Sequence, residues 1–185
     1  MWAHLYDYET MPAELENWFL TSEKNESGFV GYAFDGAELA NPWEEMTAEE
    51  LTQASGLSFG VPEGAENVVY SYLREENLAQ MAFTMGRVEL CARVQPAVPG
   101  EDGAWPDISG LYYDWDFVDE DTVGSCDASV SIVQTGEESW VELCQWYDAA
   151  PGLMYSLSAR FDHDPDGFDL GAVANMVYVP VQGDN

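Results

Sequence analysis

Positively charged residues are nearly missing from this sequence. Five lysines and arginines stand against 35 aspartates and glutamates, which gives a formal net charge of −30 at pH 7. A surface of this sign repels nucleic-acid phosphates and anionic lipids, so we expect no direct binding to nucleic acid. It attracts cations and basic proteins, or it serves only to keep the chain in solution. The charge therefore favours cations and basic proteins as partners, and it gives no information about the fold.

Three other scarcities exclude classes of site. Two histidines and three cysteines without C-x-x-C spacing cannot supply a zinc site. We expect Cys91, Cys126 and Cys144 to be free thiols, although one pair could form a disulfide in an oxidising compartment. The chain has no Gly-rich phosphate loop and no apolar run of about 18 residues, so we predict no cofactor and no transmembrane segment. Its first residues show no signal peptide.

Hydrophobic residues are plentiful despite the charge, at 46% of a 185-residue chain, which is enough for a core. The chain is organised around a short capped helix over residues 48–55. Thr47 and Glu50 have the spacing of a capping box, Met46 and Leu51 that of a hydrophobic staple, and Gly56 can end the helix. Because two turns are not stable alone in water, this helix must pack on the rest of the domain.

After this helix the apolar residues alternate with the period of β-strands. The predicted strands cover residues 67–74, 78–85, 88–94, 111–117, 123–133, 140–147 and 153–161. Tight turns between them, among them Gly86 and Asp119-Glu120-Asp121, predict a meander. Helical spacing returns over residues 168–177, before Pro180. The predicted fold class is α+β: a single antiparallel meander sheet of about six to seven strands, with short helices packed on one face.

Residues 1–40 differ from the rest and are interpreted as an N-terminal extension, followed by the sheet domain at 41–182. The sequence Thr10-Met11-Pro12 can begin a helix with an apolar face made by Leu15, Trp18 and Phe19. Residues 29–34 could add an edge strand.

Several short motifs follow one another in order: Asn41-Pro42-Trp43, Val61-Pro62-Glu63-Gly64-Ala65, Tyr70-Ser71-Tyr72, Leu78-Ala79-Gln80-Met81, Arg93-Val94-Gln95, Asp107-Ile108-Ser109-Gly110, Trp146-Tyr147-Asp148 and Tyr155-Ser156-Leu157-Ser158-Ala159. Together they resemble an uncharacterised domain-of-unknown-function family of predicted lipoproteins from Gram-positive gut bacteria. The resemblance covers about residues 41–180 and implies export and anchoring at the cell surface, with the cytoplasm as the alternative. It implies no catalytic residues, and the chain departs from the family in showing no lipobox or leader.

Two motifs invite an enzymatic or metal-binding interpretation. Asp162, Asp164 and Asp166, followed by Gly167, match the first half of an EF-hand loop, but the twelfth position is Val173, which has no carboxylate. These three aspartates are the calcium candidates, although a turn in which Asp166 caps the next helix explains them as well. Residues 56–60 match G-x-S-x-G, but a helix precedes the motif and a strand follows it, the reverse of a nucleophile elbow.

Three tryptophans and two arginines are the binding candidates. We expect Trp140 and Trp146, six residues apart on one strand, to offer an exposed platform for a sugar ring, and Trp105 could do so from a loop. Arg87 and Arg93 share one strand face and could receive an anion, although pairing with carboxylates is the simpler role for every arginine here. Asp114 and Asp116, two apart on a predicted strand, are a possible carboxylate pair for glycoside cleavage.

From these features we predict a non-catalytic binding domain whose partner is a basic protein or a glycan. The alternatives are an acidic nucleic-acid mimic that blocks the basic groove of an enzyme, and a carboxylate-dependent hydrolase. A row of exposed acids about 6–7 Å apart would favour the mimic. A cleft with two carboxylates about 5–9.5 Å apart would favour the hydrolase, and an exposed aromatic patch alone would favour the binding domain.

Overall fold

The computed structural model describes residues 41–180, apart from Asp102 and Asp166. The chain divides at Asn41 into two units, and everything below concerns the second. The helix and edge strand expected within residues 1–40 lie outside the described residues.

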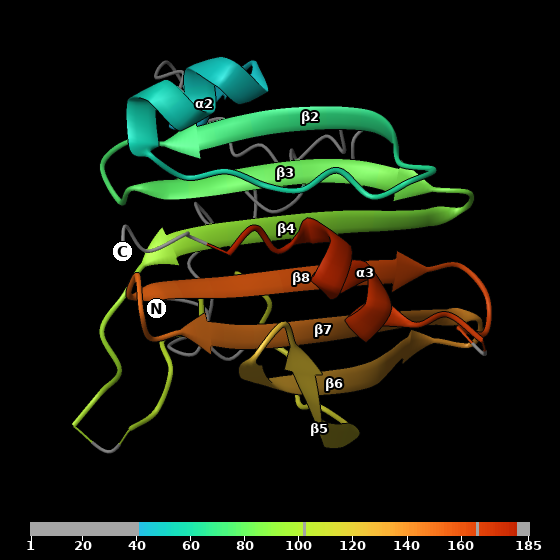
Figure 1. Cartoon of the computed structure of the whole chain (residues 1–185). Helices are drawn as coiled ribbons and strands as arrows, with labels where there is room; N and C mark the ends of the chain where they lie inside the picture. Colours follow the sequence, from blue (N-terminus) through green and yellow to red (C-terminus); the bar gives the residue numbers. More distant parts are fainter. Residues whose placement is uncertain (1–40, 102, 166, 181–185) are drawn as a thin grey trace, which may run out of the picture. The chain divides into compact units, whose positions relative to one another are not determined.

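The described part of the chain forms eight strands and two helices. In chain order these are β1 (Glu44–Met46), α2 (Ala48–Ser55), β2 (Glu66–Leu73), β3 (Leu78–Met85), β4 (Val88–Pro96), β5 (Phe117–Val123), β6 (Cys126–Gly136), β7 (Ser139–Asp148), β8 (Leu153–Phe161) and α3 (Leu170–Val177). All strands belong to one antiparallel sheet in the order β1-β2-β3-β4-β8-β7-β6-β5 (Figure 1). The antiparallel sheet with short helices is confirmed, with eight strands instead of six to seven.

The sheet is two meanders and not one, which corrects the predicted topology. Strands β1 to β4 and strands β5 to β8 each pair in sequence, and the two halves join where β4 pairs with β8. Between them the chain leaves β4 and reaches the opposite edge of the sheet through residues 97–116, which we name the crossover connection. Local turn signals do not report this pairing, because β4 and β8 are more than 50 residues apart in the chain.

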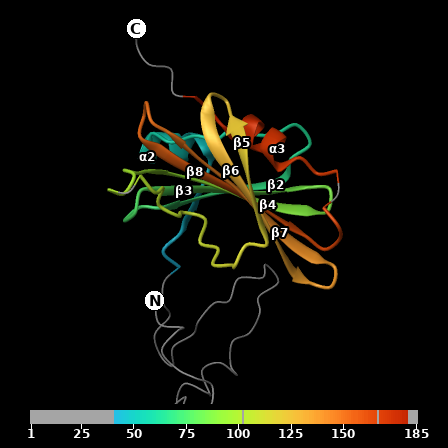
Figure 2. The ribbon, with the colours of Figure 1, turned by 90° about the horizontal axis from the view of Figure 1, so that it is seen from below.

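The two faces of the sheet are covered differently. Ala92, Leu157 and Cys144 lie in register on one face, which we name the helix face because α2 and α3 pack there. Cys91 and Ser158 lie in register on the other, which we name the connection face. Figure 2 shows both helices on one side of the sheet and the yellow-green crossover connection on the other. A binding candidate on the helix face is therefore next to α2 or α3, and one on the connection face is next to the crossover connection.

One strand was predicted in the wrong place. Residues 111–116 form no strand, and β5 instead contains the acidic triplet Asp119, Glu120 and Asp121 that we predicted as a turn. Over residues 111–117 only Leu111 and Trp115 are half-buried and the other side chains are exposed, so the alternation in the sequence does not mark a buried strand face. An edge strand tolerates an acidic triplet because its side chains remain in water.

Both helices have the end groups that their sequences indicate. In α2, Thr47 and Glu50 form the predicted capping box, and Gly56 ends the helix with a φ of 74°. The N-cap of α3 is Asp169, not Asp166 as predicted, and its carboxylate accepts a 2.8 Å hydrogen bond from the Ala172 N–H. The caps fix where each short helix begins, and packing must supply the rest of its stability.

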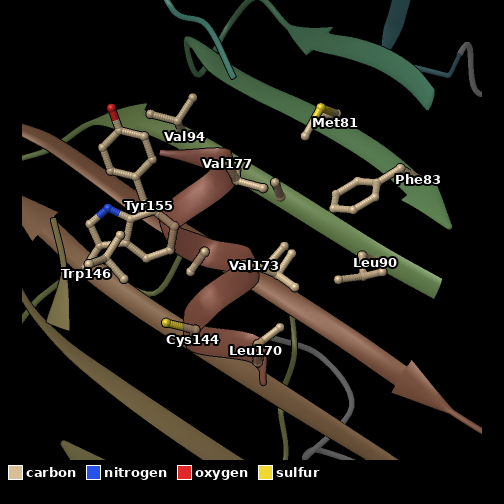
Figure 3. Packing of buried hydrophobic residues seen from close by; sticks show 14 of the residues in the cluster. Met81, Phe83, Leu90, Val94, Cys144, Trp146, Tyr155, Leu170, Val173 and Val177 are labelled. Carbon is tan, nitrogen blue, oxygen red and sulfur yellow. The ribbon is translucent and has the colours of Figure 1, made fainter. Parts of the chain in front are cut away.

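The core lies between α3 and the helix face of the sheet. Leu170, Val173 and Val177 of α3 point down onto the central strands, as Figure 3 shows. The rings of Trp146 and Tyr155 stack with their centroids 5.0 Å apart. This core is continuous across both meanders, so it holds the two halves of the sheet as one domain.

Candidate functional site

Arg93 of β4 fixes the crossover connection to the sheet. Its Nη1 donates to the carbonyl oxygens of Ile108 and Ser109, at 3.2 and 2.8 Å. Its Nε donates to Gln80 Oε1 at 2.9 Å, and the guanidinium lies 5.5 Å from the ring centroid of Trp43. All of these partners are neutral, so Arg93 acts as a structural clamp on the segment that precedes β5.

The β5–β6 hairpin presents a polar group of side chains on the connection face. Glu120 pairs with Ser129, and Thr122 pairs with Asp127, so the four side chains project from the same face. Glu120 and Asp127 are diagonal neighbours, with a spacing of about 7 Å. The hairpin thus brings two exposed carboxylates and two hydroxyls together.

Trp105 extends from the crossover connection to the same place. A tight loop precedes it, in which the Gly100 N–H donates to the Ala104 carbonyl oxygen at 2.8 Å. Two residues after it, the Asp107 carboxylate accepts a 3.1 Å hydrogen bond from Gln145 Nε2 of β7. Hydrogen bonds therefore fix the chain on both sides of Trp105.

These elements enclose a cleft of about 660 Å³, which we name the Trp105 cleft. It is lined by Trp105, Glu120, Asp121, Thr122, Asp127, Ala128 and Ser129. The volume is that of a typical ligand site, but the lining side chains that face it supply two carboxylates, from Glu120 and Asp127, and two hydroxyls, and the described lining includes no cation. The Trp105 side chain is 36% exposed, so its ring is accessible. Such walls suit a cationic or hydroxyl-rich group, since an indole face and carboxylates both attract positive charge.

The prediction of an exposed platform on β7 is wrong for Trp146. Its ring is fully buried on the helix face, and its indole N–H has no hydrogen-bond partner. Trp140 is half-buried and borders a second, smaller pocket. The alternation correctly placed both residues on one face, but α3 covers that face over Trp146, and only the tertiary structure reveals the cover. Trp105 borders a pocket whose described charged residues are all acidic, whereas the pocket beside Trp140 holds two arginines as well as two carboxylates.

The arginines are only partly paired as expected. Arg74 forms an ion pair with Glu44 at 2.8 Å, and Arg87 forms one with Asp162 at 2.6 Å. Arg93 binds neutral oxygens instead, and it lies six residues along the chain from Arg87, about 20 Å for an extended strand. The structure therefore does not bring Arg87 and Arg93 together into one anion site.

The other candidates from the sequence are rearranged. Asp114 and Asp116 lie in the crossover connection and not on a strand, so the argument that they share a strand face no longer applies. Among the described residues no group of acidic, His and Cys side chains could hold a metal ion, and Asp166 of the calcium candidates lies outside them. Asp162 is already engaged by Arg87 and by His163.

No two cysteines are within disulfide reach, and all three are free thiols. Cys91 lies on the connection face, whereas Cys144 lies buried on the helix face. Cys126 pairs in register with Val123 at the hairpin, four positions from the partner of Cys144. Strand geometry puts that separation at about 13 Å, twice the span of a disulfide.

The sequence reasoning missed four residues of the cleft: Glu120, Thr122, Asp127 and Ser129. The error came from taking the acidic triplet as a turn. The sequence did contain a signal for this hairpin, because Gly124-Ser125 is suited to a two-residue hairpin loop. In the structure these two residues form the loop between β5 and β6, with Gly124 at a φ of 61°.

No family model, curated protein or solved structure matches this chain. The resemblance to a lipoprotein family therefore stays a prediction. Neither helix in the described part of the chain has the length and apolar character needed to cross a membrane.

Proposed function

We propose that this domain is a non-catalytic binding module whose Trp105 cleft receives a lysine or arginine side chain from a basic protein. The observation that carries the proposal is the composition of the cleft. An accessible indole lies beside the carboxylates of Glu120 and Asp127, which project from the same face of the hairpin. A cationic side chain placed there gains a cation–π contact and charge-assisted hydrogen bonds at once.

The charge of the whole chain supports the same class of partner. A net charge of −30 produces a negative potential that raises the rate at which a basic protein encounters the domain. Long-range attraction alone gives no specificity, since it falls off within about 8–10 Å at physiological salt. The cleft supplies the short-range part of the recognition.

The mimic alternative has less support on β5. Asp119 and Asp121 share one face of this strand, at a spacing near that of successive phosphates, but Glu120 points to the other face. A mimic requires a longer row of acids on one surface. Recognition of a single lysine or arginine side chain requires no such row.

The hydrolase alternative rests on Glu120 and Asp127, which are diagonal neighbours on one face of the hairpin. Glycoside cleavage requires two carboxyl groups about 5–9.5 Å apart on either side of the scissile bond. Both residues are exposed. Acid catalysis by a carboxyl group relies instead on apolar surroundings that keep one of the pair protonated. Turnover of aryl glycosides that disappears in Glu120→Gln would replace our proposal with this one.

The compartment is proposed from the resemblance alone. Lipoproteins of Gram-positive bacteria are anchored at the outer surface, where basic proteins and wall glycans are both accessible. Protease treatment of intact cells that produce the full-length protein separates the two compartments: loss of the domain supports the surface, and protection supports the cytoplasm.

The test is binding to a capped decapeptide of alternating arginine and glycine, measured by NMR titration at 150 mM salt. We expect shifts centred on the Trp105 indole and the β5–β6 hairpin. Trp105→Ala changes no charge and should weaken binding at least about fivefold, the value of roughly 1 kcal/mol for a cation–π contact.

The matched control is Glu137→Gln, which removes one exposed charge from the β6–β7 turn, outside the cleft. It should bind the peptide nearly as the unaltered domain does, whereas Asp127→Asn should bind it more weakly. Equal binding by the unaltered domain and Trp105→Ala would mean that only the overall negative charge attracts the peptide, and it would overturn the proposal. Tighter binding of a neutral hexasaccharide than of the peptide would assign the cleft to glycans instead.

A further inference from the structure

A second pocket lies on the connection face, at the opposite end of β6 from the Trp105 cleft. It has a volume of about 320 Å³, and its lining includes Arg87, Glu89, Tyr113, Ser139, Trp140 and Arg160. We name it the Arg160 pocket. Two of the four arginines in a chain of net charge −30 border this one hollow.

The guanidinium of Arg160 is the unusual feature of this pocket. Arg74 and Arg87 have carboxylate partners, but Arg160 forms no ion pair with any residue in the described part of the chain. Glu89 is directly opposite Arg160 in the β4·β8 pair and still does not bridge to it. Arg93 also lacks a carboxylate partner but binds neutral oxygens, whereas the Arg160 guanidinium donates no hydrogen bond to any described residue and is available to a ligand.

The remaining charges restrict what the ligand can be. Arg87 and Arg160 are positive, while Glu89 and Asp162 are negative, so the four charged lining residues sum to zero. A dianion such as phosphate would meet two carboxylates for its two arginines. A single carboxylate can engage Arg160 through two parallel hydrogen bonds and leave the Arg87–Asp162 pair intact.

The walls of the pocket add apolar contact. Tyr113 reaches it from the crossover connection, and Val141 of β7 lies beside Arg160 on the same face of the sheet, whereas the rings of Trp140 and Phe161 point to the helix face. The hydroxyls of Thr135 and Ser139, 3.2 Å apart, form a polar edge. A ligand with an aromatic or aliphatic body beside its acid group would bury that body against Tyr113 and Val141.

From these contacts we infer that the Arg160 pocket binds a small organic monocarboxylate with an apolar body. The acid group pairs with the guanidinium of Arg160, and the body lies against Tyr113 and Val141. This site is separate from the Trp105 cleft and has the opposite ligand preference, so the proposal does not depend on the function proposed above.

The experiment is an NMR titration of the whole domain with 3-phenylpropionate, and with its neutral amide as the matched ligand. We expect saturable shifts at the Arg160 side chain and at Tyr113. The amide should bind at least about tenfold more weakly, since it forfeits the charge-assisted hydrogen bonds to the guanidinium. Inorganic phosphate should bind more weakly than 3-phenylpropionate.

Arg160→Gln should weaken 3-phenylpropionate binding as much as the change to the amide does. Arg160 is exposed, so this variant should fold normally, which thermal unfolding verifies. Arg74→Gln, an equal loss of charge at the other half of the sheet, should bind like the unaltered domain. Equal affinity for acid and amide, unchanged affinity in Arg160→Gln, or tighter binding of phosphate would each overturn the inference.

Discussion

The phenol of Tyr178 donates a 2.6 Å hydrogen bond to Oδ2 of Asp148. Tyr178 ends α3, and Asp148 ends β7, so this bond fastens the C-terminal end of the helix to the sheet. Burial raises the pKa of Tyr178, and the Asp148 carboxylate adds to the shift, so the phenol stays a donor at any physiological pH. The ring also meets Trp146 and Tyr155 edge-on, with centroid distances of 6.2 and 5.4 Å.

Tyr178→Phe should lower the free energy of unfolding by about 2 kcal/mol, because it leaves the Asp148 carboxylate with one partner fewer while the ring packing stays in place. Urea unfolding at pH 7 measures this. Tyr112→Phe is the control, because Tyr112 is 91% exposed and its loss of the same hydroxyl should change nothing. Equal stability of both variants would show that the bond adds nothing to folding.

Glu142 should make stability depend on pH. This side chain is half-buried on the helix face, and burial raises its pKa to about 7, with the charge of Asp169 contributing. An unfolded glutamate loses its proton near pH 4.5, so between that pH and 7 the folded state holds more protons than the unfolded state. Stability from this group is therefore full below pH 4.5 and is lost as the pH rises through 7, by at most about 3 kcal/mol and less where solvent screens it.

Glu142→Gln removes the titrating group and keeps the shape of the side chain. Urea unfolding from pH 4 to pH 8.5 should show the variant equal to the unaltered domain at the acid end and more stable at the alkaline end. The repulsion among other carboxylates affects both proteins alike, so the difference between them isolates Glu142. Parallel curves for the two proteins would contradict the assignment.

Two aspartates protect the exposed edge of the sheet. In β5 the Asp119 carboxylate accepts a 2.9 Å hydrogen bond from the Glu120 N–H, and the Asp121 carboxylate accepts one of 2.7 Å from the Thr122 N–H. The Thr122 carbonyl oxygen in turn accepts from Asn175 Nδ2 of α3. Edge strands with free N–H groups pair with other chains, and these bonds occupy the groups that would do so.

Asp119→Ala should therefore increase self-association, measured by analytical ultracentrifugation at several protein concentrations. Asp119→Asn is the control, because its amide oxygen can still accept from the Glu120 N–H although the charge is gone. If both variants associate, the charge of Asp119 and not its hydrogen bond protects the edge. If neither variant associates, other features of the sheet protect it.

Arg93 should stabilise the crossover connection through the geometry of its hydrogen bonds, and its positive charge alone should not be sufficient. Replacing it with lysine retains the positive charge but loses the planar guanidinium, whose Nη1 donates to two carbonyl oxygens while Nε donates to Gln80. We therefore expect a loss of stability on the order of 2 kcal/mol. Hydrogen exchange should speed up around Ile108 and Ser109. Arg74→Lys, at an exposed ion pair, should leave both measurements unchanged. Unchanged exchange in Arg93→Lys would mean that other contacts hold the connection.

Much of the fold could be read from local patterns. The capping box at Thr47, the turn at Gly86 and the alternation along β3, β4 and β8 are determined by residues that are neighbours in the chain, so they appear in the sequence directly. The acidic charge and the absence of a phosphate-binding or zinc-binding motif were equally plain. These features predicted an antiparallel sheet with short helices, and the charge is the basis for proposing a basic partner.

Other features depend on contacts that no local pattern records. The pairing of β4 with β8, the burial of Trp146 under α3 and the meeting of Trp105 with Glu120 and Asp127 each join segments far apart in the chain. The sequence alone thus determined which segments extend or coil and what charge they carry. Only the tertiary structure decided which faces are covered and which side chains share a cleft, because burial and proximity arise from packing between distant segments.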